Sequence, residues 1–152
     1  VLMKLQDTSI DVATFYTGDA LPKWGMFDQY GYPHKIYQAF PAYNELYKTG
    51  NRVKVESKLD SALMEAGVSD DGRHAALMLV SQTALGCDTR PVNVLLANLP
   101  WKGDVRCEVL RVDGQYDLEK VDEQTLAAGQ TLLKVPLPCR SIIVVKLGEV
   151  EK

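Results

Sequence analysis

The chain has 152 residues, which is the size of one ordinary domain and enough to bury a sizeable core. Hydrophobic residues make up 46% and charged residues 24%, a composition that excludes an intrinsically disordered chain. The formal net charge of −3 gives no basic surface for nucleic acid or an anionic membrane, and no apolar run approaches the roughly 20 residues that span a bilayer. Because the chain starts at Val1 and not at Met, we expect a processed or excised piece of a longer protein.

Residues 1–50 have the character of an α/β protein. LMKLQ (2–6) predicts the last turn of a helix, and DVATFY (11–16) predicts a short strand because it is rich in β-branched and aromatic residues. A loop rich in Gly and Pro follows, and Pro33 then suits the first position of a helix. Apolar residues recur at helical spacing up to Tyr47, with a kink or break expected at Pro41 and an end at Gly50.

From Arg52 the hydrophobic period changes to two. The segments RVKVES, ALMEAGV, RHAALMLVSQ, VNVLLANL, DVRCEVLRVD, TLLKVPL and SIIVVKLGEV predict about seven short strands. The Asp71-Gly72 pair predicts a hairpin between the second and third of these segments. VDEQTLAAG (121–129) is interpreted as a loop or a short helical turn. Residues 51–152 are therefore expected to form an antiparallel β-sandwich.

Aromatic side chains are concentrated between Trp24 and Tyr47, which hold one of the two Trp, two of the three Phe and five of the seven Tyr. Four of them follow a helical spacing: Tyr37, Phe40, Tyr43 and Tyr47. They are expected to form one inner helical face, which packs on a core or, if the barrel is absent, folds onto the sandwich, dimerises or stays mobile.

The three cysteines are far apart, and neither His34 nor His74 lies near a second ligand, so the sequence predicts no metal site and no other cofactor. Free thiols are the preferred interpretation of Cys87, Cys107 and Cys139, with one disulfide as the alternative.

LQDTSIDVATFYTGDALPKWGMFDQYGYPHKIYQAFPAYNEL (5–46) resembles the last barrel segment of clan-A retaining glycoside hydrolases, above all the β-xylosidase and α-L-iduronidase group, glycoside hydrolase family thirty-nine. The match includes a D-A-x-x-Y-like strand motif and a W/Y-G-L-F-D-x-x-G-x-P-K-x-x-Y-x-A-F signature. The matching residues are Asp11, Val12, Ala13 and Tyr16, followed by Trp24, Gly25, Met26, Phe27, Asp28, Gly31, Pro33, Lys35, Tyr37, Ala39 and Phe40.

The resemblance implies a mainly β fold, in which an antiparallel β-sandwich is preceded by a short strand and helix remnant of a (β/α)8 barrel. Residues 1–50 would then be the last β/α unit of the barrel and residues 51–152 a C-terminal β-sandwich. The catalytic glutamates of such enzymes lie at the ends of strands four and seven, so the chain is expected to contain no catalytic residue. The Asn44-Glu45 pair falls late in the predicted helix, where it does not match the catalytic Asn-Glu pair of the family.

Sugar contacts could come from a few side chains. Tyr16, Asp19 and Trp24 lie in or next to the loop 17–23, which would border the pocket of an intact barrel, because barrel enzymes carry their sites on loops after the strands. Trp101, in NLPWKGDV, is interpreted as a hydrophobic plug at the end of the sandwich or as a sugar-stacking platform.

The sequence thus predicts the accessory β-sandwich region of a xylosidase-like glycoside hydrolase, which is inactive alone and supports an absent catalytic barrel. A carbohydrate-binding module is the main alternative, and an interaction domain of immunoglobulin type is a weaker one. Expected partners are the missing barrel, carbohydrate and a second copy bound through Tyr37, Phe40, Tyr43 and Tyr47. The compartment stays open, although secretion or a periplasmic location suits a parent that degrades polysaccharides.

Overall fold

The structure is a computed structural model that describes residues 2–19, 25–82 and 91–150. Its elements are α1 (Leu2–Leu5), α2 (Ala39–Tyr47), β1 (Asn51–Val53), β2 (Ala62–Val68), β3 (His74–Ser81), β4 (Pro91–Leu95), β5 (Val105–Val112), β6 (Asp117–Leu126), β7 (Leu132–Pro136) and β8 (Ile142–Glu149). One sheet has six antiparallel strands in the order β1-β2-β3-β8-β5-β6, and the other pairs β4 with β7. The predicted antiparallel sandwich is confirmed.

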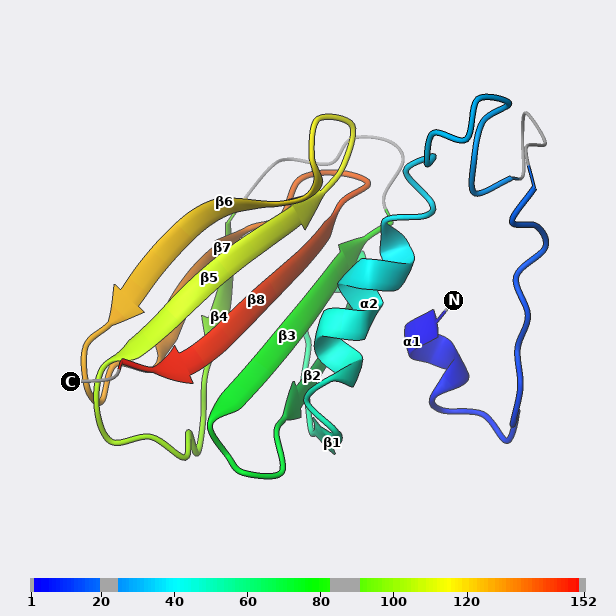
Figure 1. The fold of residues 1–152 in the computed structure, drawn as a ribbon. Coiled ribbons are helices and arrows are strands. Elements are labelled where there is room, and N and C mark those ends of the chain that lie inside the picture. Colours follow the sequence, from blue (N-terminus) through cyan, green and yellow to red (C-terminus); the bar gives the residue numbers. More distant parts are fainter. Residues whose placement is uncertain (1, 20–24, 83–90, 151–152) are drawn as a thin grey trace.

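The large sheet is covered on both faces (Figure 1), by α2 on one side and by the β4–β7 pair on the other. Both faces of the central strand β3 are apolar and need such a cover, because successive side chains point to opposite faces of the sheet. Leu77 and Leu79 enter the core between the sheets, whereas Ala76 and Met78 face α2. A strand buried on both faces has a nearly continuous apolar sequence, as HAALMLVS has.

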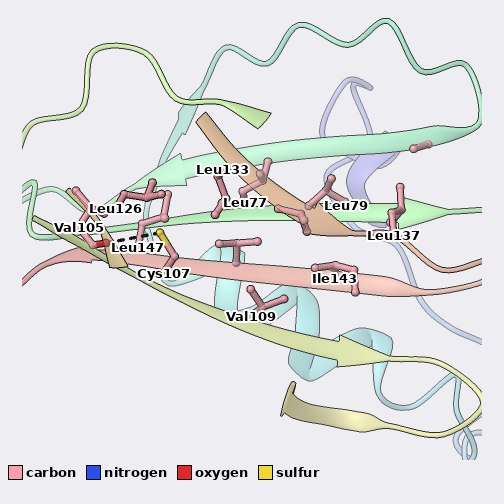
Figure 2. Packing of buried hydrophobic residues seen from close by; sticks show 13 residues of the cluster. Leu77, Leu79, Val105, Cys107, Val109, Leu126, Leu133, Leu137, Ile143 and Leu147 are labelled. Atoms are coloured by element: carbon pink, nitrogen blue, oxygen red, sulfur yellow. Dashed lines mark hydrogen bonds between the residues drawn. The ribbon is translucent and has the colours of Figure 1, made fainter. Parts of the chain in front are cut away.

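The first core lies between the two sheets, and Figure 2 shows its side chains converging from both. Its fully buried members include Leu79, Val109, Leu133, Ile143 and Val145. The second core is smaller and lies under the helices. It joins Met3 of α1 and Ala42 and Leu46 of α2 to the sheet. The chain start is thus attached to the sandwich through the second core.

The hairpin between β2 and β3 forms where the Asp71-Gly72 pair predicts it. The two strands pair from Ala62↔Ser81 to Val68↔Ala75. Gly72 has φ +67°, a conformation that glycine adopts without steric cost, and its N–H donates to the carbonyl of Ser69 at 2.9 Å. The turn chemistry therefore sets the register of the pair.

The strand predicted over residues 11–16 is absent, although α1 confirms the helical turn before it. This segment is extended but pairs with no strand of the described residues, and a lone strand leaves its backbone groups unpaired. The segment before the aromatic helix is therefore a helical turn followed by an extended arm. We call residues 6–19 and 25–38 the N-terminal arm.

The aromatic helix is shorter than predicted. Turns occupy residues 35–38, and α2 begins only at Ala39. Pro41 neither kinks nor breaks it, because it is the third helical residue, where a backbone N–H has no partner within the helix. The helix has Ala42 and Leu46 as its buried residues, so its packed face is narrower than the expected aromatic one.

The interpretation of residues 121–129 as a loop or helical turn is wrong. Most of this segment belongs to β6, which pairs with β5 at the edge of the large sheet. An edge strand has one side that faces solvent, so it accommodates the many charged residues of this segment. These charged residues hide the two-residue hydrophobic period by which a strand is usually predicted.

The cysteines differ from one another. Cys139 is disulfide-bonded, which corrects the preferred interpretation as a free thiol, whereas Cys107 is free and buried in the first core. Cys87 lies outside the described residues. Burial raises the pKa of the Cys107 thiol to about 11, so this group behaves as a small hydrophobic side chain.

Gly67 is expected to tolerate no side chain. A Cβ at this position in β2 would lie 2.0 Å from Oγ1 of Thr49 and 3.1 Å from the carbonyl oxygen of Asn51. Thr49 is itself buried and donates to the carbonyl of Leu46 at 2.7 Å. Gly67→Ala should lower the free energy of unfolding by about 1–3 kcal/mol in urea denaturation. Gly114→Ala is the control, since no atom lies within 4 Å of the Cβ built there; equal losses would contradict the prediction.

Candidate functional site

Much of the N-terminal arm lies apart from the sandwich (Figure 1) and holds its shape by local contacts, although Asp7 and Lys35 contact the sheet. The rings of Phe15 and Phe40 meet edge to face with centroids 5.6 Å apart, and those of Phe27 and Tyr37 lie 5.3 Å apart. The N–H of Met26 donates to the carbonyl of Thr17 at 3.0 Å. This bond joins Thr17, at the start of the predicted loop, to the segment that follows the loop.

The signature residues after this loop build a tight turn. Oδ1 of Asp28 accepts the N–H of Tyr30 at 2.8 Å and that of Tyr32 at 2.9 Å. Gly31 has φ +86°, and Phe27 bridges to Pro33 across the turn. Asp28, Gly31 and Pro33 thus have a structural reason for their spacing, because a carboxylate, a left-handed residue and a fixed φ together define this turn.

The residues predicted to contact sugar lie along the arm. Tyr16 is 80% exposed, and Asp19 is exposed and donates its own N–H to Oγ1 of Thr17 at 3.2 Å. Trp24 lies outside the described residues. Tyr16 therefore precedes the predicted loop and Asp19 lies near its start, while their sugar-binding role stays a prediction.

Trp101 is packed into the end of the sandwich. Its ring is partly buried against the first core, and its Nε1–H donates to the carbonyl of Gly72 at 2.8 Å. A buried indole usually finds such a partner for its N–H. This placement favours the interpretation as a plug that closes the β2–β3 turn over that of a stacking platform.

The four aromatic residues proposed for dimerisation do not share one free face. Tyr37 precedes α2 and contacts Phe27, Phe40 contacts Phe15, and Tyr43 packs against the second core. Tyr47 is 73% exposed. Association of two copies through this helix stays a prediction.

A polar cluster that the sequence does not predict attaches the arm to the sheet. Nζ of Lys35 lies 2.6 Å from Oδ1 of Asp117 and 3.2 Å from the carbonyl oxygen of Tyr116. Asp113, next to them, is buried and pairs with Arg111. Although burial opposes it, the N–H groups of Gln115 and Tyr116 and the Arg111 side chain lower the pKa of Asp113.

A shallow pocket of about 330 Å³ lies beside this cluster. Its polar lining comes from Lys35, Asp113, Arg140 and two buried serines, Ser81 and Ser141. Oγ of Ser141 donates to the carbonyl of Pro138 at 2.6 Å, so this hydroxyl is already engaged.

Glu45, the acid of the Asn44-Glu45 pair, serves in ion pairs. Its carboxylate lies 2.7 Å from Nζ of Lys48 and 3.0 Å from Nζ of Lys146 in β8. Burial would raise the pKa of Glu45, but these two ammonium groups outweigh it and lower the pKa. This acid fastens α2 to the sheet and stays ionised, which is the reverse of what a general acid needs.

The described residues contain neither a cluster of metal ligands nor a membrane-spanning helix. Within residues 2–19, 25–82 and 91–150, no three His, Cys, Asp or Glu side chains gather as metal ligands. None of the helices described there has the length and apolar character needed to cross a membrane.

Comparisons with known proteins give a fold relationship. No protein-family model matches the sequence, and no curated protein matches it. Among solved structures, a glucosidase from Croceicoccus marinus superposes with a TM-score of 0.70 at 16% identity, over 85% of this chain and 34% of that one. A monomeric β-xylosidase from Caulobacter crescentus gives 0.66 at 14% identity, over 84% and 33%.

A third structure, the GH39 enzyme from Xanthomonas axonopodis pv. citri, has a TM-score of 0.60 at 11% identity, over 84% of this chain and 32% of that one. At such identities the likeness establishes the fold and leaves the activity open. The chain spans about a third of the structures that it matches. It therefore has the fold of a part of glycoside hydrolases.

Proposed function

We propose that this chain is the accessory, C-terminal part of a xylosidase-like retaining glycosidase, and that its N-terminal arm packs against the catalytic barrel of the same protein. Catalysis then belongs to the barrel, and the sandwich braces it. The finer assignment to glycoside hydrolase family thirty-nine rests on the signature between Trp24 and Phe40.

The observation that carries this proposal is the apolar surface of the arm. Its exposed large hydrophobic side chains are Ile10, Val12, Phe15, Tyr16, Tyr30, Tyr32, Ile36 and Tyr37. Val12 and Tyr16 are 79% and 80% exposed. So many exposed large apolar side chains along one segment suit an interaction site, because leaving apolar surface in water is unfavourable. An extended segment without a pairing strand, such as residues 11–16, also suits completion of a sheet supplied by a neighbouring unit.

Two further observations support the same proposal. The chain corresponds to about a third of several glycoside hydrolases, which leaves room for a catalytic unit in a longer protein. The disulfide at Cys139 is typical of proteins from oxidising compartments, as expected for a secreted or periplasmic enzyme that degrades polysaccharides.

Turnover of aryl β-xylosides and α-arabinosides tests the proposal. The 152-residue chain should give none, and the product of the full reading frame should be active. In that longer protein Val12→Asp should lower activity or assembly by at least about tenfold, because it places a charge in an apolar interface. Leu95→Asp, at a residue of β4 that is 72% exposed, is the matched control.

Robust turnover by the 152-residue chain alone would refute the proposal. Equal activity of the Val12→Asp and Leu95→Asp variants would mean that Val12 of the arm does not lie in an interface with the barrel. Saturable fluorescence quenching of the isolated chain by xylo-oligosaccharides would instead support the carbohydrate-binding alternative.

A further inference from the structure

Three charged side chains meet where α1 lies against the edge of the large sheet. Arg52 of β1 is shared between two carboxylates: its Nη1 lies 2.6 Å from Oδ1 of Asp7, and its Nε lies 2.7 Å from Oε1 of Glu65. Asp7 is the second residue after α1, whereas Glu65 lies in the middle of β2. One guanidinium therefore connects the chain start to the sandwich.

Glu65 is the unusual member of this group. It is 5% exposed, and its second oxygen, Oε2, is buried without a hydrogen-bond partner. An ionised carboxylate in this position loses hydration at one oxygen and receives no replacement, so its charged form is disfavoured. Burial accordingly raises the pKa of Glu65, although Arg52 opposes this effect.

The surroundings of Glu65 come from every element packed there. From α1 and the residues after it come Lys4 and Asp7, and from α2 comes Tyr43. Burial, and then the charge of Glu65, raises the pKa of Tyr43, whose hydroxyl is bonded to the Gln6 side chain. On β3, the uncharged Met78 lies opposite Glu65. Arg52 and Lys4 are thus the cations near it, and Arg52 is divided between two acids.

We infer that Asp7, Arg52 and Glu65 form a pH-sensitive clamp that holds α1 on the sandwich most firmly in mild acid and loosens as the pH rises. When α1 separates, Glu65 regains water, and this gain is largest for its ionised form. Deprotonation therefore favours release. Release also withdraws Met3 from the second core, so the clamp controls the exposure of an apolar surface beside α2.

The directions of the pKa shifts of Glu65 and Asp7 define the pH range in which the clamp holds α1 most firmly. Burial raises the pKa of Glu65 above its ordinary 4.5, so the share of this burial that α1 supplies favours docking below that value, and this preference is lost as the pH rises through the docked value. The hydrogen bond from Arg52 lowers the pKa of Asp7 below its ordinary 3.8, so its contribution is lost as the pH falls through the docked value. Docking is therefore strongest between the two titrations.

Amide hydrogen exchange measured by NMR on the whole chain tests the clamp. The N–H groups of Asp7 and Thr8 donate to the carbonyls of Lys4 and Leu5 and therefore report on α1. Their protection factors, corrected for intrinsic exchange, should fall as the pH rises above the ordinary pKa of 4.5 and level off once Glu65 is ionised in the docked state, roughly tenfold for each unit by which the docked pKa exceeds that of the released state. Glu65→Gln should abolish this fall, and Lys54→Gln, in the exposed pair with Glu56, should preserve it.

Two results would overturn the inference. One is a Glu65→Gln chain whose protection factors fall with pH as in the wild type. The other, which needs no variant, is a carbon-13 titration of the Glu65 carboxyl in the wild type with a midpoint at or below 4.5. The clamp is supported if the Glu65 carboxyl titrates with a midpoint above 4.5 and Glu65→Gln abolishes the fall of the protection factors with pH. If Glu65→Gln does not fold, the carboxyl titration and the protection factors of the wild type decide.

Discussion

Leu133→Ala is expected to lower the free energy of unfolding by about 2–5 kcal/mol. Leu133 lies in β7, is 0% exposed and packs into the first core between the two sheets (Figure 2). Its truncation removes apolar contacts and leaves a cavity that the facing strands can fill only by moving. Because an isolated two-stranded sheet is marginal in water, the β4–β7 pair depends on this packing more than the larger sheet does.

The neighbouring residue supplies the control. Leu132 belongs to the same strand and differs by pointing to the other face, where it is 45% exposed. Leu132→Ala should change the free energy of unfolding by no more than about 0.5 kcal/mol. Urea denaturation followed by circular dichroism measures both. Equal losses in the two variants would mean that β7 does not pack on the large sheet as described.

The strands of the sandwich were predictable where local chemistry and burial agree. The β2–β3 hairpin follows from an Asp-Gly turn between two apolar segments, and β5 follows from alternation around Cys107. In both places the side chains that face the core recur every second residue. Local sequence is sufficient there because a two-residue period has one structural meaning.

The edge strand β6 was not predicted, although a signal for it exists. Its charged residues suggest a loop, yet Asp113-Gly114 follows β5 in the way that Asp71-Gly72 follows β2. Oδ1 of Asp113 accepts the N–H of Gln115 at 2.8 Å and shapes the turn into β6. Turn chemistry was thus the more informative signal, because hydrophobic pattern is weak on a strand with a solvent-facing side.

The features that could not be predicted depend on tertiary contacts between segments far apart in the sequence. A strand at residues 11–16 has suitable composition but needs a partner strand, and composition does not supply one. The Lys35–Asp117 and Arg52–Glu65 pairs each join residues of different elements, and only the fold brings them together. The candidate interaction surface was predictable as an aromatic segment, whereas its exposure could be known only from the structure.

Cys139→Ser is expected to lower the free energy of unfolding by about 2–5 kcal/mol, as loss of a native disulfide does in small secreted domains. Cys139 lies between β7 and β8, next to the buried Leu137 and Ser141. A crosslink there restricts the unfolded chain and fixes the connection that leads into the central strand β8. Thermal unfolding with and without a reductant measures the effect.

Reductant should lower the unfolding temperature of the wild type and leave that of Cys139→Ser unchanged, since the variant has no such crosslink to lose. Cys107 does not confuse this comparison: its thiol is free, fully buried and has its pKa raised by burial to about 11, so it reacts poorly in the folded protein. A wild type that is equally stable under both conditions would contradict a stabilising disulfide. It would also weaken the argument for a secreted or periplasmic location, because that argument assumes that the fold depends on the disulfide at Cys139.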